Sequence, residues 1–583
     1  MTDLLIVLTM GLPWVGALVV WRLGDDKPDL QHRLAFVFAL AAGIAALALI
    51  PLHTSDVELS IDAGSVFGKF TFVPDSLGVF LAAIATVIGS LAVLFSSDYM
   101  QGEKQLGRYY TSMLLFIGAM VGLALTGSIL LLFIFWEITA LCSYALISFY
   151  NDDPKAVAGG IKALIITQFG GIGMLAGALI CFAYLGDYQI ATFIEKADTL
   201  PSDMLTVMAF GFLAAAAAKS AQFPFHTWLP GAMEAPTPVS ALIHAATMVN
   251  AGVYLLARFY PAFAGVDYWT DAVMVVGLVS ALMAASMAVV AKDLKRVLAY
   301  STISQLGYMV YAVGVGSIFA SQFHLLSHAI FKALLFLSAG AVIHGVGTRD
   351  MFKMGGLGQA MPFNRNVFMI GALALAGVPV LNGFWSKEII LEHGLHDGPA
   401  WAYYGMLAGA GITALYTARM VWLVFFGRAH YETEHAHDAG PMMKVATGIL
   451  AVGTLTSWLV IGLFGEMLEK SLPHHHIHVE AASDMLEAVI TAPETLVALG
   501  VVLIGAVVWV IHRAFLPVGE FLAPLGAAAD QDYGLNWVNR QIVQITQSLG
   551  ERLRATQTGY LNWNVFGIVV GVIVTLGVLA WGA

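Results

Sequence analysis

The chain consists of long apolar runs separated by short polar stretches. We count about 16 runs of some 20 apolar residues each, the length of a helix that crosses a bilayer. They lie near residues 3–21, 34–51, 75–97, 109–126, 128–149, 160–185, 204–223, 239–260, 268–291, 297–316, 318–345, 366–392, 401–427, 444–465, 493–516 and 562–582. This pattern predicts an all-α, polytopic membrane protein.

Composition and charge placement support this class and add an orientation. The 583 residues are 59% hydrophobic and 11% charged, whereas soluble domains carry about 25% charged residues. Lys and Arg outside the runs gather in loops after odd-numbered runs, as at Lys292 and Arg296. The positive-inside rule therefore predicts a multi-pass protein of the cell inner (cytoplasmic) membrane with both termini non-cytoplasmic. We expect membrane lipid and no nucleic acid as partners.

Two of the runs are interrupted and carry a lysine. Run seven holds Lys219 and leads into a segment with four prolines, and run twelve holds Lys387 after Pro379 and Gly383. Proline removes helix hydrogen bonds, which hydrocarbon cannot replace, and a lysine in lipid costs about 3 kcal/mol or more. Both features predict broken helices that line an enclosed, partly hydrated cavity.

The spacing of the interruptions suggests the domain organisation. They lie five runs apart, so two five-run units would have opposite orientations, as in inverted repeats with interrupted helices. We therefore divide the chain into 1–105 (runs one to three), 106–262 (first repeat, runs four to eight), 263–428 (second repeat, runs nine to thirteen) and 429–583 (runs fourteen to sixteen). Within the last part, residues 532–556 show apolar positions at steps of three and four, which predicts a cytoplasmic amphipathic helix.

Further titratable residues lie inside the runs. Glu137 is the only charge in run five, and His244 follows the proline-rich break. His324, His328 and Lys332 follow at i, i+4 steps, which places them on one helix stripe. An intramembrane ionisable group indicates function by default, and histidine exchanges protons near neutral pH. A proton relay is the favoured interpretation; hydrogen-bonded core residues are the alternative.

Accessory polar positions accompany this series. Ser304, Gln305 and Tyr308 form a polar stripe that should face protein or water. Gln168 lies in run six, and Glu388 directly follows Lys387. Lys162, also in run six, either joins the series or extends its ammonium group to the headgroups.

No cofactor or metal is expected in this chain, and no catalytic site. It has no P-loop, no dinucleotide fingerprint and no cysteine cluster. The HxxxH pair on run eleven lacks a third ligand, and Lys332 as a cation opposes a metal there. The run His474–His478 could bind metal adventitiously, but a solvated loop is favoured.

Five segments resemble a known family. FWEITALCSY, AAKSAQFPFHTWLPGAMEAPTPVSALIHA, DLKRVLAYSTISQLGYM, HLLSHAIFKALLFLSAG and GVPVLNGFWSKEIIL are similar to the antiporter-like subunits of respiratory complex I (L-type) and of Mrp-type cation/proton antiporters (A-type). The resemblance covers at least residues 75–430. It implies two inverted repeats and a polar axis in mid-membrane.

The resemblance also implies roles for individual residues. Glu137 and Lys219 would form the charge pair of the first half-channel, His244 would connect, Lys332 would be the central lysine and Lys387 the terminal one. His324 and His328 match histidines beside the central lysine. Gln168 and Gly171 stand where the complex I form carries arginine and aspartate, which is more Mrp-like, and too few residues separate the last two runs for the long lateral helix of that form.

The function expected from these features is proton translocation, with or without exchange for Na+, by a subunit of a multi-subunit complex. Its partners would be other antiporter-like and small membrane subunits. Two alternatives stay open: a subunit of a redox-driven complex (NADH:quinone or hydrogenase-like) or bicarbonate-uptake complex with a soluble redox or zinc-bearing partner, and a stand-alone transporter of a small solute. A membrane anchor with a defunct ion path is a further rival.

Overall fold

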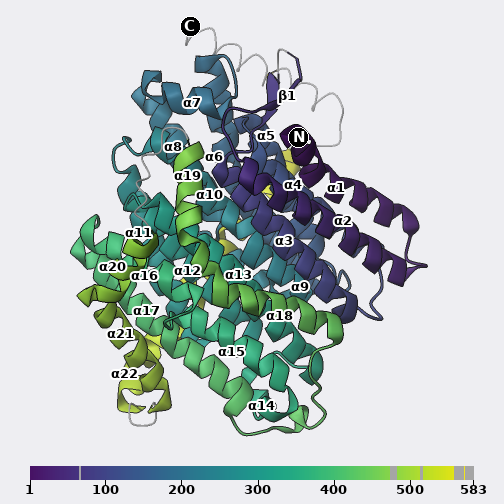
Figure 1. Cartoon of the computed structure of the whole chain (residues 1–583), viewed down its shortest axis with the longest axis vertical. Coiled ribbons are helices and arrows are strands. Elements are labelled where there is room, and N and C mark those ends of the chain that lie inside the picture. The colour runs from purple at the N-terminus through teal and green to yellow at the C-terminus, as the bar shows by residue number, and fades with distance from the viewer. Residues whose placement is uncertain (65–66, 473–481, 512–515, 557–569, 571–583) are drawn as a thin grey trace. The chain divides into compact units, whose positions relative to one another are not determined.

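The computed structural model describes residues 1–64, 67–472, 482–511, 516–556 and 570. The chain divides into two compact units, Met1–Gly526 and Ala527–Ala583, which we describe separately. The structure is 81% helical, which confirms the all-α class. Figure 1 shows the long helices of the larger unit packed side by side, with α12 and α13 surrounded by the others.

The first part of the chain forms ten helices and one hairpin. The helices are α1 (Thr2–Leu23), α2 (Pro28–Leu49), α3 (Ser76–Tyr99), α4 (Leu106–Leu125), α5 (Ile129–Ile147), α6 (Pro154–Leu185), α7 (Ile190–Lys196), α8 (Ser202–Lys219), α9 (Thr237–Ala241) and α10 (Met248–Phe263). The strands β1 (Leu59–Asp62) and β2 (Lys69–Phe72) pair antiparallel, with Leu59 opposite Phe72.

The rest of the described chain is helical as well. Its helices are α11 (Trp269–Val290), α12 (Leu294–Gly314), α13 (Ile318–Val346), α14 (Leu357–Ala360), α15 (Pro362–Ala376), α16 (Asn382–His396), α17 (Ala400–Val421), α18 (Pro441–Thr456), α19 (Ile461–Ser471), α20 (Ala482–Thr491), α21 (Pro493–Val510), α22 (Leu516–Asp530) and α23 (Leu535–Thr556).

Thirteen helical segments of the described chain are long and apolar enough to cross a membrane. Two further expected runs are absent from that set for physical reasons: α12 carries the polar stripe, and run twelve is divided into α15 and α16. The sixteenth run, 562–582, lies outside the described residues. The chain is therefore a multi-pass membrane protein, while the count of sixteen stays a prediction.

The first interruption follows Lys219. Helix α8 ends there, and residues 220–236 form two short 3₁₀ turns before α9 begins. Between α9 and α10 the backbone widens into a π-helical turn, Leu242–Ala246. Thr247 Oγ1 donates to the carbonyl of Leu242, 2.7 Å away, and Asn250 Nδ2 donates to that of Ala245, also 2.7 Å away. These side chains satisfy carbonyls near the irregular turn, so it persists in a buried position.

The second interruption separates α15 from α16. Gly377 (φ 82°) and Val380 (φ 77°) adopt left-handed backbone in the connection. Gly383 lies so close to the first half that a Cβ there would be 2.0 Å from the carbonyl oxygen of Ala374. A glycine is therefore required where the second half crosses the end of the first. The relation of the two halves of the chain as inverted repeats stays a prediction.

One basic residue lies in the interior of the bundle. Arg258 lies in α10 with 6% of its surface exposed. Its guanidinium donates to both carboxylate oxygens of Asp75 and to the hydroxyl of Tyr254. Asp75 is 183 residues away in sequence and also caps α3 through the backbone N–H of Gly78. The buried partner explains why the arginine tolerates the interior.

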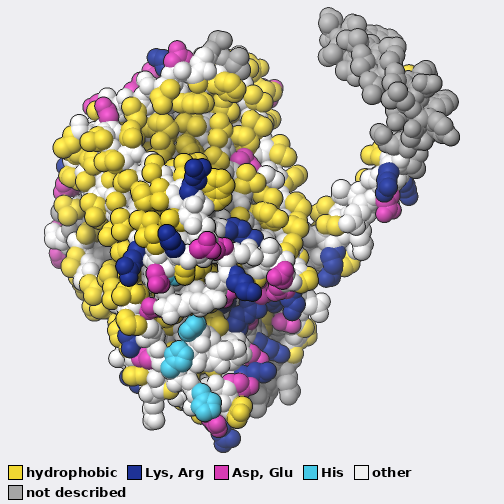
Figure 2. Space-filling view, turned by 90° about the vertical axis from the view of Figure 1, so that its right-hand side faces the viewer, with side chains coloured by type: hydrophobic (Ala, Val, Ile, Leu, Met, Phe, Trp, Pro, Cys, Tyr) yellow, Lys and Arg dark blue, Asp and Glu magenta, His cyan; other side chains and the backbone are white. Residues whose placement is uncertain are grey.

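The surface of the larger unit reflects its membrane environment. Apolar side chains are exposed on outer helices, such as Leu18 on α1, Ile44 on α2 and Val452 on α18. Figure 2 shows hydrophobic side chains covering the upper part of one face, and Lys, Arg, Asp, Glu and His gathered across its lower part. This is the distribution expected for lipid contact beside a headgroup or aqueous region.

The smaller unit contains α23, which matches the amphipathic helix expected at 532–556. Its apolar side chains lie at helical spacing and are exposed: Val538, Ile542, Ile545, Leu549 and Leu553. The structure forms a helix at this place, and its cytoplasmic position stays a prediction. The surface on which its apolar face lies stays a prediction.

Candidate functional site

The central element is α13, which carries His324, His328 and Lys332 on one stripe. All three side chains are fully buried. Lys332 Nζ donates a 2.6 Å hydrogen bond to Ser301 Oγ on α12. No acidic residue forms a direct ion pair with Lys332 among the described residues. A lysine whose partner is a hydroxyl is not locked in its charged form, as a lysine in an ion pair would be.

His324 joins three helices. Its Nδ1 lies 2.9 Å from Ser386 Oγ on α16, and its Nε2 lies 3.2 Å from Gln305 Oε1 on α12. An amide oxygen only accepts, so Nε2 donates to Gln305. The Ser386 hydroxyl, which also lies 3.0 Å from the carbonyl of Asn382, can donate to Nδ1 of a neutral ring or accept from Nδ1 of a protonated one.

His328 and Ser304 are buried beside this group without hydrogen-bond partners among the described residues. The His328 ring lies 6.4 Å from that of His324, between centroids, and 5.5 Å from that of Phe331. The predicted stripe of Ser304, Gln305 and Tyr308 is fully buried, as expected. These residues form a run of polar side chains inside an otherwise apolar bundle.

Lys387 lies at the far end of the series, next to the second interruption. Its Nζ donates to the carbonyl of Leu375, 2.7 Å away, and lies 5.9 Å from the centroid of the Tyr308 ring. Leu375 lies just before the end of α15, where helix carbonyls lose their intrahelical partners. The break therefore provides the acceptor for the buried ammonium group.

Glu388, the residue after Lys387, lines a polar cavity. It is 7% exposed and lines a space of about 40 Å³ together with Glu392, His396 and Glu494. Tyr403 and Thr495 complete its polar lining. The cavity is large enough for one or two water molecules, and its carboxylates and imidazole can exchange protons.

The first interruption holds Lys219, which is fully buried at the end of α8. Its Nζ donates to the carbonyl of Trp136, 2.7 Å away, and lies 4.9 Å from the centroid of the Trp136 ring. Glu137 follows Trp136 on α5, and no direct ion pair joins it to Lys219. The two charges are neighbours that interact electrostatically.

Glu137 is half-buried and lies against α6. The carboxylate hydrogen-bonds with Gln168, whose side chain is exposed. A Cβ at Gly171 would lie 2.5 Å from Glu137 Oε1, so the glycine makes room for the acid. The small residue at this position thus has a defined function in placing Glu137.

His244 lies between these two groups, in the π-helical turn. It is fully buried, and neither ring nitrogen has a hydrogen-bond partner among the described residues. Its ring contacts are aromatic: Trp228 at 6.5 Å and Phe336 at 5.4 Å between centroids. Trp228 Nε1 donates to the carbonyl of Ala218, beside Lys219, and Phe336 lies one turn beyond Lys332. The site thus consists of two hydrogen-bonded groups with an imidazole between them.

Three further titratable or basic residues are buried. His226 is fully buried beside Trp228, with both ring nitrogens unpartnered among the described residues. Lys295 is 3% exposed and donates to the carbonyl of Ala235, 2.6 Å away. Arg419 is buried and donates to the carbonyl of Ala291.

Lys162 is half-buried on α6 and interacts electrostatically with His226. In the described part of the chain, no group of three His, Cys, Asp or Glu side chains could hold a metal ion. The run His474–His478 lies outside the described residues. Cys142 and Cys181 are both buried and unpaired.

Comparisons with known proteins match this architecture. Residues 126–413 match the family model for the membrane part of NADH:quinone oxidoreductase and Mrp antiporters. Residues 61–110 match the model for the N-terminus of chain 5 of complex I, the NADH-ubiquinone oxidoreductase. The fold and the buried series thus define a membrane protein of the antiporter-like class.

Relatives narrow this class. The chain is 39% identical over 433 residues to the Na(+)/H(+) antiporter subunit A1 of Staphylococcus aureus strains JH9 and Newman, a match that covers 69% of this chain and 54% of the relative. It belongs to the family of antiporter-like membrane subunits shared by complex I (L-type) and Mrp antiporters (A-type). Since the match covers 54% of the relative, the chain spans about half the length of the curated relatives it matches.

Solved structures agree. The Mrp complex from Dietzia sp. DQ12-45-1b contains a chain with a TM-score of 0.83 and 29% identity, covering 99% of this chain and 63% of that one. An archaeal respiratory membrane complex, the membrane-bound sulfane sulfur reductase, contains a chain with a TM-score of 0.70 and 24% identity, covering 83% of this chain and 99% of that one. The second likeness concerns the fold alone.

Proposed function

We propose that this chain is the proton-translocating, antiporter-like subunit of a multi-subunit complex in the cell membrane. The observation that carries the proposal is the series of buried titratable side chains from Lys219 through His244 and Lys332 to Lys387. Each lysine is held by a hydroxyl or backbone carbonyl and not by a carboxylate. Such groups are costly inside a membrane protein and are retained there when they carry ions or protons.

The proposed route follows the observed contacts. Glu137 and Lys219 hold a proton at one end, and the charge of each biases the protonation of the other. The unpartnered imidazole of His244 passes the proton towards Lys332 by turning between the two hydrogen-bonded groups. His324, with Gln305 and Ser386, relays it towards Lys387.

Release takes place beyond the second interruption. Glu388 takes the proton from the neighbouring Lys387 and shares it with Glu392, Glu494 and His396 around the polar cavity. The acids at this end favour departure because they attract the proton away from the buried, cationic series.

Uphill transport needs a driver outside this chain. Moving one elementary charge against 100 mV costs about 2.3 kcal/mol, and the sequence contains no nucleotide-binding fingerprint. Exchange against Na+ across the membrane is the driver that fits the names of the S. aureus relatives. Other antiporter-like and small membrane subunits are the proposed partners; co-purification of an iron–sulfur or zinc-bearing subunit would instead assign the chain to a redox-driven or bicarbonate-uptake complex.

The proposal is tested by reconstituting the complete complex into vesicles and following internal pH after a Na+ pulse. Lys219→Ala and Lys332→Ala should each abolish the pH change. Lys196→Ala is the matched control, since Lys196 is an exposed lysine on α7, and it should transport normally. Normal exchange by both buried-site variants would refute the route, and solute uptake by the isolated chain would favour a stand-alone transporter.

The membrane orientation is a separate proposal. We place both termini outside the cytoplasm, so Ser202 and Lys292 should face opposite sides of the membrane. Cysteines introduced at these two positions should react selectively with a membrane-impermeant maleimide from opposite sides of sealed vesicles. The native cysteines are buried and provide little background. Labelling of both from the same side would contradict the proposed topology.

A further inference from the structure

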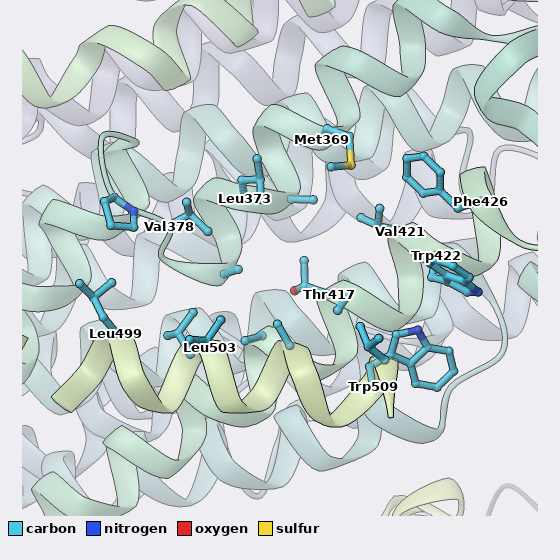
Figure 3. A pocket seen from close by; sticks show the side chains of 18 residues that line it. Met369, Leu373, Val378, Thr417, Val421, Trp422, Phe426, Leu499, Leu503 and Trp509 are labelled. Carbon is cyan, nitrogen blue, oxygen red and sulfur yellow. The ribbon is translucent and has the colours of Figure 1, made fainter. Parts of the chain in front are cut away.

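An apolar groove lies on the outside of the second interruption. It has a volume of about 600 Å³ and is lined by α15, the connection after it, α17 and α21. Figure 3 shows Leu499, Leu503 and Trp509 of α21 facing Leu373 and Val421 across the groove. The volume is within the range of ligand sites, about 300–1,000 Å³.

The lining is almost entirely hydrocarbon. Thr417 is its one hydroxyl, and Thr417 Oγ1 has no hydrogen-bond partner among the described residues. Several of the lining residues are alanines, among them Ala372, Ala418 and Ala506. A polar solute would find almost no hydrogen-bonding partner here, so the occupant must itself be apolar over most of its length.

The length of the groove distinguishes a lipid chain from a helix. Its α21 wall runs from Leu499 to Val510, about 17 Å at 1.5 Å per residue. This is about half of the 30 Å hydrocarbon core that a partner's transmembrane helix would have to cross. A groove of one leaflet's depth fits an acyl chain.

The two ends of the groove differ in chemistry. One end is formed by Val378 and Pro379 at the break. The other carries Trp422 and Trp509, and tryptophan is typical of the membrane–water interface. An acyl chain would therefore extend from the tryptophans inwards to the break.

Basic residues belong to the segments that adjoin the tryptophan end. Exposed Arg428 follows Phe426, which lines the groove, by two residues. The segment Gly355–Gly358 packs against the backbone around Arg428 and Phe425, which brings Arg365 and, two residues before Gly355, Lys353 to the same end. A phosphate headgroup is complementary to such a group of cations.

From these features we infer that the groove binds an anionic phospholipid, with an acyl chain against the break and the phosphate beside Arg428. The inner end of the acyl chain would pack behind Leu375, the residue whose carbonyl accepts the hydrogen bond from Lys387. The lipid thus supports the break from its outer side. This binding site does not depend on the proposed transport function.

The test uses the complete complex, stripped of lipid and titrated with dioleoylphosphatidylglycerol or dioleoylphosphatidylcholine while bound lipid is counted by native mass spectrometry. Ala506→Phe and Ala418→Phe fill the groove from two different helices and should each weaken phosphatidylglycerol binding about fivefold or more. Ile504→Phe is the control: the same helix and the same new side chain, at a position that is 64% exposed and outside the lining.

The headgroup contact has its own variant. Arg428→Gln should weaken phosphatidylglycerol binding about tenfold and leave phosphatidylcholine binding unchanged. Because Arg428 is exposed, the variant should fold as the wild type does. The inference is overturned if Ala506→Phe and Ala418→Phe bind as much lipid as Ile504→Phe. It is equally overturned if wild type does not prefer phosphatidylglycerol, or if cross-linking from Ala506 captures a partner subunit's helix in the groove.

Discussion

Lys387 Nζ donates a 2.7 Å hydrogen bond to the carbonyl oxygen of Leu375, across the break between α15 and α16. The lysine comes from the second half of the interrupted helix and the acceptor from the first. The contact therefore couples the state of the amine to the geometry of the break: a deprotonated amine still has hydrogens to donate, but the attraction between charge and carbonyl is lost.

Replacing Lys387 by arginine should keep the positive charge at this position but prevent the release of a proton. A guanidinium group can still donate to Leu375, but it cannot be deprotonated in a protein. We expect Lys387→Arg to assemble normally and to lose Na+-driven pH change in vesicles, by about a hundredfold if the amine must release its proton in each cycle. Transport at more than half the wild-type rate would show that Lys387 acts only as a fixed charge.

Gln305 should control the protonation of His324. The amide oxygen accepts from the ring in the observed arrangement, so Gln305→Leu removes a partner of the imidazolium form. We expect a transport rate reduced about tenfold, a loss comparable to one charged hydrogen bond. Gln305→Glu keeps an acceptor and should retain more activity than Gln305→Leu.

The reverse order of the two Gln305 variants would contradict this assignment. The comparison is made in the same vesicle assay, with complex assembly checked by gel filtration. A matched control is Gln101→Leu, because this glutamine is exposed in the loop after α3.

Gly171→Ala should displace Glu137. The added methyl group would lie 2.5 Å from Glu137 Oε1, closer than any stable contact, so the carboxylate must move. The proposed route depends on the electrostatic interaction between Glu137 and Lys219, so we expect the transport rate to fall several-fold. The free energy of unfolding should change by about 1 kcal/mol or less. Ile172→Ala, at the next, exposed position, serves as the control; equal rates in both variants would remove the special function of this glycine.

The buried ion pair between Asp75 and Arg258 should stabilise the fold. Asp75→Asn leaves an uncompensated buried guanidinium and weakens the α3 cap, for an expected loss of about 3–5 kcal/mol. A lower midpoint of thermal unfolding in detergent would show this. Glu466→Gln breaks an exposed pair with Lys470 and should not shift the midpoint measurably. Equal midpoints for the two variants would contradict a stabilising function of the buried pair.

Some of the site was predictable because it depends on local geometry. His324, His328 and Lys332 share a stripe in any continuous helix, and the apolar positions of residues 532–556 share a face for the same reason. The prolines and glycines around Lys219 and Lys387 indicated where helices end. In each case the deciding signal lies within one or two helical turns.

Other features depend on contacts between distant segments and have no local signal. Nothing near Arg258 indicates Asp75 as its partner, and nothing near Ser386 indicates that it meets His324. A tryptophan beside a histidine, as at His226 and Trp228, is typical of a membrane interface, yet both side chains are buried within the bundle. Burial of such a segment is decided by the helices that surround it.

The π-helical turn at His244 makes the number of residues in this segment as important as their identity. A π-helical turn holds one residue more than an α-helical turn, so deleting one residue between Thr237 and His244 would allow an ordinary helix and shift the positions of the residues within the turn. The imidazole would then leave its position between Trp228 and Phe336, although every side chain named in this site would still be present in the gene. A redesign that removes one residue to make the helix regular would preserve the sequence motif but lose the position of the imidazole between the two hydrogen-bonded groups.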